Sequence, residues 1–192
     1  IYPDPYGQVL IIGPWNYPIQ LILQPLIGAI AAGNTMVVKP SELSEHSSAV
    51  VSRLLRETFK EEYIAVVEGG IEPTTALLDV KWDYVFFTGS VPVGRIVYQA
   101  AAKHLTPVTL ELGGKSPCVI DKDVHMEFGM KRLAWGKFMN CGQTCVAPDY
   151  FLVDKKAKQK FVELFAKTTK EFFGENPQQS PDYGRIINEK HF

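Results

Sequence analysis

The stretch Tyr84-Val85-Phe86-Phe87-Thr88-Gly89-Ser90-Val91-Pro92-Val93-Gly94 joins an apolar run to a glycine turn and a helix-compatible segment. The run Tyr84–Thr88 predicts a buried strand, and the turn after it predicts a helix over Val91–Lys103. Amides at such a helix start can face a phosphate group. The spacing of Gly89 and Gly94 is not the Gly-x-Gly-x-x-Gly fingerprint, so the stretch alone is a weak indication of a nucleotide.

Other apolar, β-branched runs on both sides of this stretch also predict strands. They are Val9–Ile12, Thr35–Lys39, Tyr63–Val67 and Val108–Leu112. Helix-compatible segments lie between them, at Tyr17–Ala32, Ser44–Glu61 and Thr74–Leu78. Nearly continuous apolar strands that alternate with helices favour an α/β fold with a doubly wound, Rossmann-like parallel sheet, covered on both faces. A ligand is expected in the crevice at the carboxyl ends of the strands.

The pattern changes after Gly113-Gly114, where we expect the start of a second α/β domain. Brief strands are predicted at Val119–Ile120 and Tyr150–Val153, and helices at Met126–Met139 and Lys156–Phe172. The last helix places Phe161, Leu164 and Phe165 on one side. We therefore divide the chain into residues 1–111 and 112–192. The chain opens on Ile1 and leaves the second layer unclosed, so we expect a segment of a longer polypeptide.

Charge and composition narrow the partners of the chain. Its 20 basic and 21 acidic side chains give a net charge of −1, which argues against nucleic acid or an anionic membrane surface and favours a small neutral substrate. The apolar stretch Ile19–Ala32 is interrupted by polar residues, proline and glycine, so no membrane segment is expected. The four histidines are scattered, and Cys118, Cys141 and Cys145 form no zinc pattern, so we expect no metal site and a reducing compartment.

The run Asn140-Cys141-Gly142-Gln143-Thr144-Cys145 surrounds its last thiol with small polar residues. Such a loop offers accessible backbone amides and suits a nucleophilic Cys145. The alternative is a small hydrophobic residue at a helix–loop junction.

Other runs carry polar groups next to predicted strands. Asn16 lies in Pro14-Trp15-Asn16-Tyr17-Pro18, and Glu111 lies in Thr109-Leu110-Glu111-Leu112-Gly113-Gly114-Lys115-Ser116-Pro117. Taken alone, Asn16 is typical of a turn. Glu111 is either a desolvated base at an apolar strand end or a carboxylate satisfied by hydrogen bonds. Together with Val37-Val38-Lys39-Pro40-Ser41-Glu42 and the opening stretch, these runs resemble the aldehyde dehydrogenase superfamily in content and order. The resemblance covers nearly the whole chain and is greatest to the class 3 branch, which acts on fatty and aromatic aldehydes.

The resemblance implies NAD(P)-dependent oxidation of an aldehyde to a carboxylic acid. Cys145 would form a thiohemiacetal and then a thioester. The fatty aldehyde substrates would place the reaction in lipid metabolism. The side chain of Asn16 and the backbone N–H of Cys145 would bind the oxyanion, and Glu111 would activate the hydrolytic water. Residues 1–111 would form the dinucleotide-binding domain and residues 112–192 the incomplete start of the catalytic domain.

The same resemblance assigns the segment after the fourth strand to the dinucleotide: Gly89, Ser90, Val91, Pro92, Val93 and Gly94. Lys39 and Glu42 follow the second strand, where a doubly wound fold holds the adenosine ribose. Lys39 can equally be a surface charge, and Glu42 can belong to a capping turn. A carboxylate beside the ribose disfavours a 2′-phosphate, so we expect NAD, with NADP as a second possibility. We also expect a cytoplasmic homodimer, with anchoring through a C-terminal tail as an alternative.

Two other classes of function stay open at this point. A cysteine hydrolase or thiol redox protein would also use Cys145 but needs a histidine or a second cysteine as its partner. A non-catalytic nucleotide-binding or interaction module needs no nucleophile. Several residues near the motifs are candidates for an apolar substrate funnel or for ordinary core packing: Tyr17, Trp135, Phe138, Met139 and Thr144.

Overall fold

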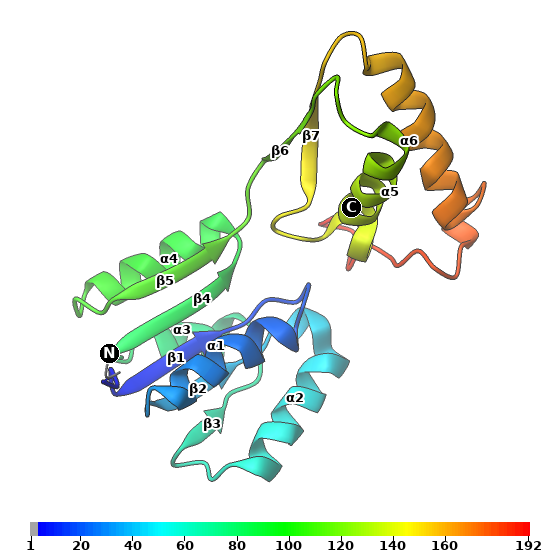
Figure 1. The fold of residues 1–192 in the computed structure, drawn as a ribbon. Coiled ribbons are helices and arrows are strands. Elements are labelled where there is room, and N and C mark those ends of the chain that lie inside the picture. The colour runs from blue at the N-terminus through cyan, green and yellow to red at the C-terminus, as the bar shows by residue number, and fades with distance from the viewer. Residues whose placement is uncertain (1–3) are drawn as a thin grey trace. The chain divides into compact units, whose positions relative to one another are not determined.

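The computed structural model describes residues 4–192 and divides the chain into two compact units, Ile1–Leu112 and Gly113–Phe192. The first unit is built around a five-stranded parallel sheet (Figure 1). Its strands are β1 (Gln8–Ile12), β2 (Thr35–Lys39), β3 (Ile64–Val66), β4 (Tyr84–Gly89) and β5 (Val108–Leu112). They lie in the order β3-β2-β1-β4-β5, and every neighbouring pair is parallel.

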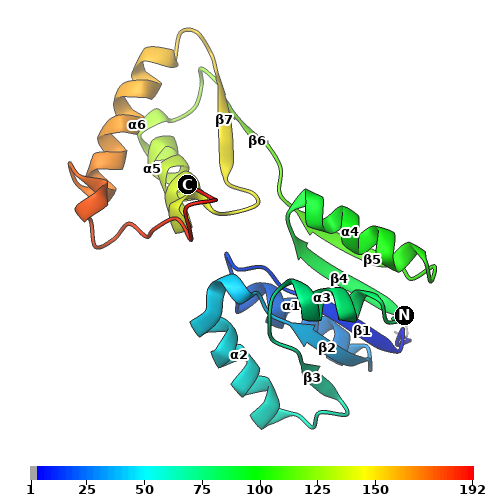
Figure 2. The same ribbon diagram turned by 180° about the vertical axis from the view of Figure 1, so that it is seen from behind.

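Helices cover both faces of this sheet because its strands are apolar on both sides (Figures 1 and 2). Val9 and Ile11 of β1 pack with α1 (Gln20–Ala31) and α2 (Glu45–Thr58). Leu10 and Ile12 face the other way and pack with α3 (Ile71–Leu78) and α4 (Val91–Ala102). The prediction of a doubly wound, Rossmann-like sheet is confirmed.

Three helix boundaries in this unit differ from the sequence-based prediction by more than one residue. The helix predicted from Tyr17 begins at Gln20, because a residue that precedes a proline, here Pro18, is disfavoured in helical conformation. The helix predicted to reach Glu61 ends at Thr58, where Phe59 turns to an extended conformation and packs on the core. The helix predicted from Thr74 already begins at Ile71, since its Pro73 lies in the first turn, where no backbone donor is needed.

The second unit contains a two-stranded parallel sheet of β6 (Ser116–Ile120) and β7 (Pro148–Val153). The connection between them contains α5 (Met126–Phe138), and α6 (Lys158–Phe173) follows β7. One core cluster joins the sheet to both helices: Ile120, Met126, Met130, Leu133, Ala157 and Phe161. Both strands begin earlier than predicted, at Ser116 and Pro148, although prolines lie in these first residues.

Three short 3₁₀ turns also lie among the described residues, and of these only a turn at Glu42 was considered in the sequence analysis. They are η1 (Glu42–Ser44), η2 (Met139–Gly142) and η3 (Pro177–Gln179). Within residues 4–192, no helix combines the length and the apolar character needed to cross a membrane.

Candidate active site

Several predicted site residues of the first unit lie where its parallel strands end. All five strands run in the same direction, so their carboxyl ends form one edge of the sheet. Asn16 follows β1, Glu42 follows β2 and Ser90 follows β4, while Glu111 lies near the end of β5. The strand order reverses between β1 and β4, which is the place where doubly wound sheets bind ligands.

The turn between β4 and α4 exposes a helix N-terminus at this edge. Ser90 is the N-cap residue, and its hydroxyl accepts a hydrogen bond from the backbone N–H of Val93 at 3.5 Å. Pro92 lies in the first helical turn, where its missing N–H costs no hydrogen bond. Gly94 is buried, and a Cβ at this position would lie 2.8 Å from Cδ2 of Leu112. The glycine therefore permits close packing of α4 against the end of β5.

A buried lysine and a half-exposed glutamate form an ion pair after β2. The Nζ atom of Lys39 lies 2.9 Å from Oε2 of Glu42, with the two side chains 4% and 45% exposed. Partial burial alone would raise the pKa of Glu42, but the Lys39 hydrogen bond, a backbone hydrogen bond and the Lys39 charge together lower it. Lys39 is thus not a surface charge. Glu42 does lie in a turn before α2, which Ser41 caps through Leu43.

The two predicted catalytic residues of the first unit have different surroundings. Asn16 is half-buried in a bend that follows Gly13 and Pro14. Glu111 is exposed and pairs in register with Thr88 of β4. The expected desolvation of the Glu111 carboxylate is therefore not found among the described residues, because Glu111 lies on β5, an edge strand of the sheet, and is exposed there. Its exposure leaves the carboxylate accessible to water.

The Cys145 loop belongs to the second unit and contains an unusual backbone. Asn140, Cys141 and Gly142 are consecutive left-handed residues, with φ angles of 52°, 58° and 76°. Only glycine adopts this region without cost, so the conformation of Cys141 is strained. The chain then turns through Cys145 into β7. The prediction of a polar loop before a thiol is confirmed, but the left-handed run was not predicted.

Cys145 is the exposed thiol of the three cysteines, all of which are free. Burial raises the pKa of the Cys118 thiol. Burial also raises the pKa of Cys141, although a hydrogen bond with Tyr183 and the charge of Arg185 oppose the shift. Since the thiolate is the nucleophilic form, Cys118 and Cys141 are poorly suited to attack a substrate. Cys145 is the one cysteine of the three that is exposed, while the other two are partly buried.

The residues proposed for an apolar funnel do not share one environment. Trp135 is 62% exposed and Met139 is 36% exposed, so neither is a core residue in this chain. Phe138 instead packs in an aromatic cluster with Phe165, Phe173 and Tyr183. Tyr17 and Thr144 are half-buried. The funnel stays a prediction.

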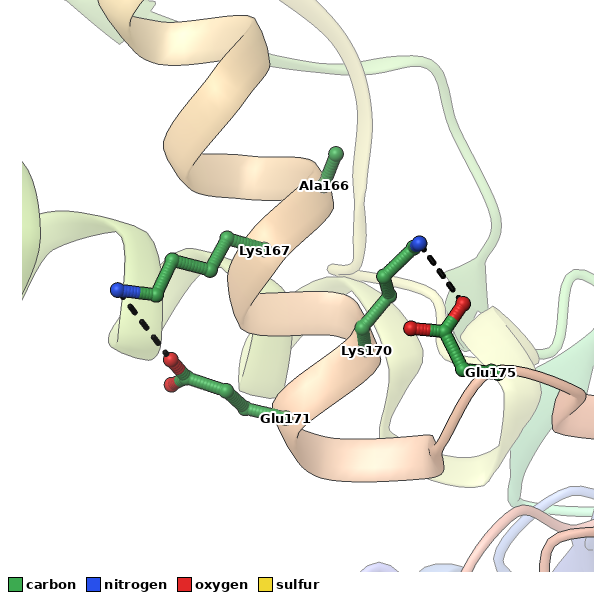
Figure 3. Close-up of a pocket in the computed structure, with 5 residues that line it drawn as sticks. All are labelled: Ala166, Lys167, Lys170, Glu171 and Glu175. Atoms are coloured by element: carbon green, nitrogen blue, oxygen red, sulfur yellow. Dashed lines mark ion pairs between the residues drawn. The ribbon is translucent and has the colours of Figure 1, made fainter.

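One further surface feature lies on α6 and is lined by none of the candidate site residues. A depression on α6 is lined by exposed residues and contains two ion pairs, Lys167–Glu171 at 3.8 Å and Lys170–Glu175 at 2.8 Å (Figure 3). It contains no nucleophile and no buried polar group. No group of three His, Cys, Asp or Glu side chains in the described part of the chain is arranged to hold a metal ion.

Sequence reasoning missed two residues beside the Cys145 loop, Gln143 and Tyr183. The side-chain amide of Gln143 bonds to backbone groups of Arg185 and Ile187, more than forty positions further along the chain. Tyr183 contacts Cys141. No local pattern connects segments this far apart, although Gln143 stood inside the run that identified Cys145.

The whole chain matches the aldehyde dehydrogenase family, over residues 1–192. It is 57% identical to aldehyde dehydrogenase family 3 member A2 of Macaca fascicularis and 57% identical to 4,4′-diaponeurosporen-aldehyde dehydrogenase of Staphylococcus aureus. It is 55% identical to the dimeric NADP-preferring aldehyde dehydrogenase of Mus musculus. Each match covers 100% of this chain but only 40% to 42% of the relative, so the chain spans about two fifths of their length.

Solved structures agree with this relationship. The substrate-bound structure of Staphylococcus aureus AldH covers 98% of this chain with a TM-score of 0.94 and 57% identity, and 41% of that protein is matched. A variant of aldehyde dehydrogenase C from Pseudomonas syringae, in complex with NAD⁺ and octanal, covers 97% with a TM-score of 0.87 and 33% identity, and 39% of it is matched. Fold, motif order and relatives agree, and the chain belongs to the aldehyde dehydrogenase family.

Proposed function

We propose that the protein containing this chain oxidises fatty or aromatic aldehydes to carboxylic acids, with Cys145 as the nucleophile and NAD as the preferred cofactor. The observation that carries the proposal is the exposed Cys145 thiol in its strained loop, within a chain of this family. An aldehyde carbon does not readily release hydride until addition makes it tetrahedral, and a thiolate can make that addition.

The first step forms a bond between the sulfur of Cys145 and the aldehyde carbon. The electron pair of the C=O π bond moves to oxygen, which becomes an oxyanion. The side-chain amide of Asn16 and the backbone N–H of Cys145 are the proposed donors to this oxygen. A bound nicotinamide cofactor would supply the acceptor for the hydride that leaves the same carbon, which would stay bonded to the sulfur of Cys145 as a thioester.

The second step hydrolyses that thioester. Glu111 takes a proton from water, the water oxygen bonds to the thioester carbon, and the carbon–sulfur bond breaks. The acid is released and the Cys145 thiolate is regenerated. Accessibility to water supports this role for Glu111, because a base for hydrolysis must reach a water molecule.

The edge of the first unit fits a dinucleotide. The hydroxyl of Thr88 is buried without a hydrogen-bond partner among the described residues, next to the turn that opens α4. The N-terminus of α4 can donate backbone N–H groups to a pyrophosphate, and the segment Gly89–Gly94 is the proposed contact. Lys39 and Glu42 would hold the adenosine ribose. The Glu42 carboxylate repels a 2′-phosphate, which favours NAD over NADP.

The broader assignments follow from the same proposal. Residues 1–111 would be the dinucleotide-binding domain and residues 112–192 part of the catalytic domain. One relative is named as dimeric, which supports a homodimer. Three free cysteines support a reducing compartment, the cytoplasm.

Cys145→Ser tests the assignment of the nucleophile. The variant should lose aldehyde-dependent NADH formation while NAD binding, followed by calorimetry, stays within about twofold of the unmodified protein, since the thiol and the nucleotide edge belong to different units. Cys118→Ser is the matched control and should keep turnover. Normal turnover in Cys145→Ser would overturn the proposal.

A further inference from the structure

The side chain of Gln143 makes three hydrogen bonds, one within the Cys145 loop and two to a distant segment. Its Nε2 atom donates to the carbonyl oxygens of Asn140 at 2.9 Å and Arg185 at 3.1 Å. Its Oε1 atom accepts from the backbone N–H of Ile187 at 2.9 Å. Both ends of one amide are thus used, and the partners are backbone groups on the two segments. Gln143 is two residues before Cys145 in the chain.

The two connected segments are the strained bend and the Tyr183–Ile187 segment. The sulfur of Cys141 in the bend lies against this segment, since a Cβ at Gly184 would be only 3.2 Å from it. Tyr183 packs on Phe173 with ring centroids 4.8 Å apart. The guanidinium of Arg185 donates to the carbonyls of Tyr183 at 2.7 Å and Gly184 at 2.8 Å, which stabilises the fold of the segment itself. The segment is therefore an ordered support.

A left-handed run at Asn140–Gly142 persists only if its surroundings hold it, since each non-glycine residue there costs free energy. The backbone N–H of Gln143 also donates to the carbonyl of Asn140, at 3.1 Å. Gln143 therefore ties the end of the bend to its beginning and to the support. The position of the Cys145 sulfur, two residues later, therefore depends on the conformation of this bend. Small misplacements of a reacting group lower the reaction rate strongly.

We propose that Gln143 is a positioning residue, which fixes the Cys145 loop against the Tyr183–Ile187 segment and so holds the thiol where it can react. This inference rests on the proposed function for its catalytic consequence. The connection itself is a separate, structural property of the chain. The connection can therefore be tested by measurements that do not depend on aldehyde oxidation.

The test compares Gln143→Ala with the unmodified chain by amide hydrogen exchange and by ¹⁹F NMR of a trifluoromethyl label on Cys145. In Gln143→Ala the Ile187 amide should exchange at least about tenfold faster, because its acceptor is lost. The label should change from one narrow resonance to a broadened or multiple signal, while exchange at Met130 in α5 stays unchanged. Gln159→Ala is the matched control, since the side chain of Gln159 donates to Glu163 within α6 at 2.7 Å.

Gln143→Glu adds a pH readout that general destabilisation would not give. The ionised carboxylate keeps the acceptor for Ile187 but cannot donate to the carbonyls of Asn140 and Arg185. A protonated carboxyl group can donate one such bond. Relative to the unmodified chain at the same pH, the label signal of Gln143→Glu should therefore approach the normal single line as the pH falls.

Aldehyde oxidation supplies the catalytic readout. In Gln143→Ala, kcat per folded molecule should fall roughly 100-fold while KM stays within about twofold. Unchanged Ile187 exchange and an unchanged label signal would overturn the inference, and so would an equal effect of Gln159→Ala. If the unmodified protein oxidises no aldehyde, the proposed function fails, and the exchange and label measurements still decide whether Gln143 holds the loop.

Discussion

The two units of the chain differ in how fully helices cover the faces of their sheets. In the first unit five strands are covered on both faces by helices, and two separate clusters of buried side chains result. In the second unit two strands are covered on one face, and the other face leaves Val119 at 72% and Leu152 at 53% exposure. These two residues are neighbours across the β6–β7 pair. The difference teaches that two core clusters lie behind the proposed nucleotide edge, while the unit that carries the thiol loop has one.

Among substitutions in the first unit, Glu111→Gln should have the largest effect on turnover, and it tests whether this unit supplies the hydrolytic base. Steady-state turnover should fall roughly 100- to 10,000-fold, because the amide cannot take a proton from water. A burst of NADH should survive, since hydride transfer comes before hydrolysis. Rapid-quench measurement of the burst checks this. Equal loss of the burst and the steady state would instead make Glu111 a positioning residue.

Asn16→Ala tests whether the first unit also supplies an oxyanion donor. Turnover should fall roughly 100- to 1000-fold, as for other sites that lose one such donor. Steady-state kinetics with a medium-chain aldehyde provide the measurement, and circular dichroism provides the control for folding. A loss below about tenfold would leave Asn16 as a turn residue.

Core substitutions in each unit test whether the two units are stable separately. Leu10 in the first unit and Met130 in the second are fully buried. Leu10→Ala should cost about 3 kcal/mol of unfolding free energy through lost burial and a residual cavity. Hydrogen exchange should show loss of protection in β1 and β4 with α5 unaffected, and Met130→Ala should show the reverse. Loss of protection in both units with either substitution would show that they unfold together.

Glu42→Gln should have a smaller effect, and its pH dependence follows from the lowered pKa of Glu42. The variant should lose about 1 kcal/mol of stability at pH 7, since Lys39 is buried while Glu42 is half-exposed and screened by solvent. Folding lowers the pKa of this carboxyl below its usual 4.5. The contribution is therefore present above pH 4.5 and disappears as the pH falls through the folded-state value.

Urea unfolding at several pH values measures this difference between Glu42→Gln and the unmodified chain. Glu68→Gln is the matched control, because its partner Arg56 is exposed and the pair should contribute less. The preference for NAD over NADP should also narrow in Glu42→Gln, mainly in KM. An unchanged ratio of the KM values for NAD and NADP would show that a residue other than Glu42 contacts the ribose.

The first unit could be predicted from sequence more fully than the second, for a physical reason. Buried parallel strands such as Val9–Ile12 are continuous apolar runs, so composition alone marks them. The strand β6 begins with Ser116 and Pro117 and has one face covered, so only its Val119–Ile120 end was predicted. Candidate site residues such as Cys145 and Lys39 stood in recognisable runs. The exposure of Glu111 and the contacts of Gln143 depend on pleat and long-range packing, which no local pattern contains.

The left-handed conformation of Cys141 sets the stability of the chain against the placement of the Cys145 loop. A search for stabilising substitutions would choose Cys141→Gly early, because glycine relieves roughly 1 to 2 kcal/mol of backbone strain. The same change removes the sulfur that lies against Gly184, and with it one contact between the bend and its support. A more stable chain would thus have a looser loop in front of Cys145. Selection for heat resistance and selection for turnover should therefore favour different residues at this one position.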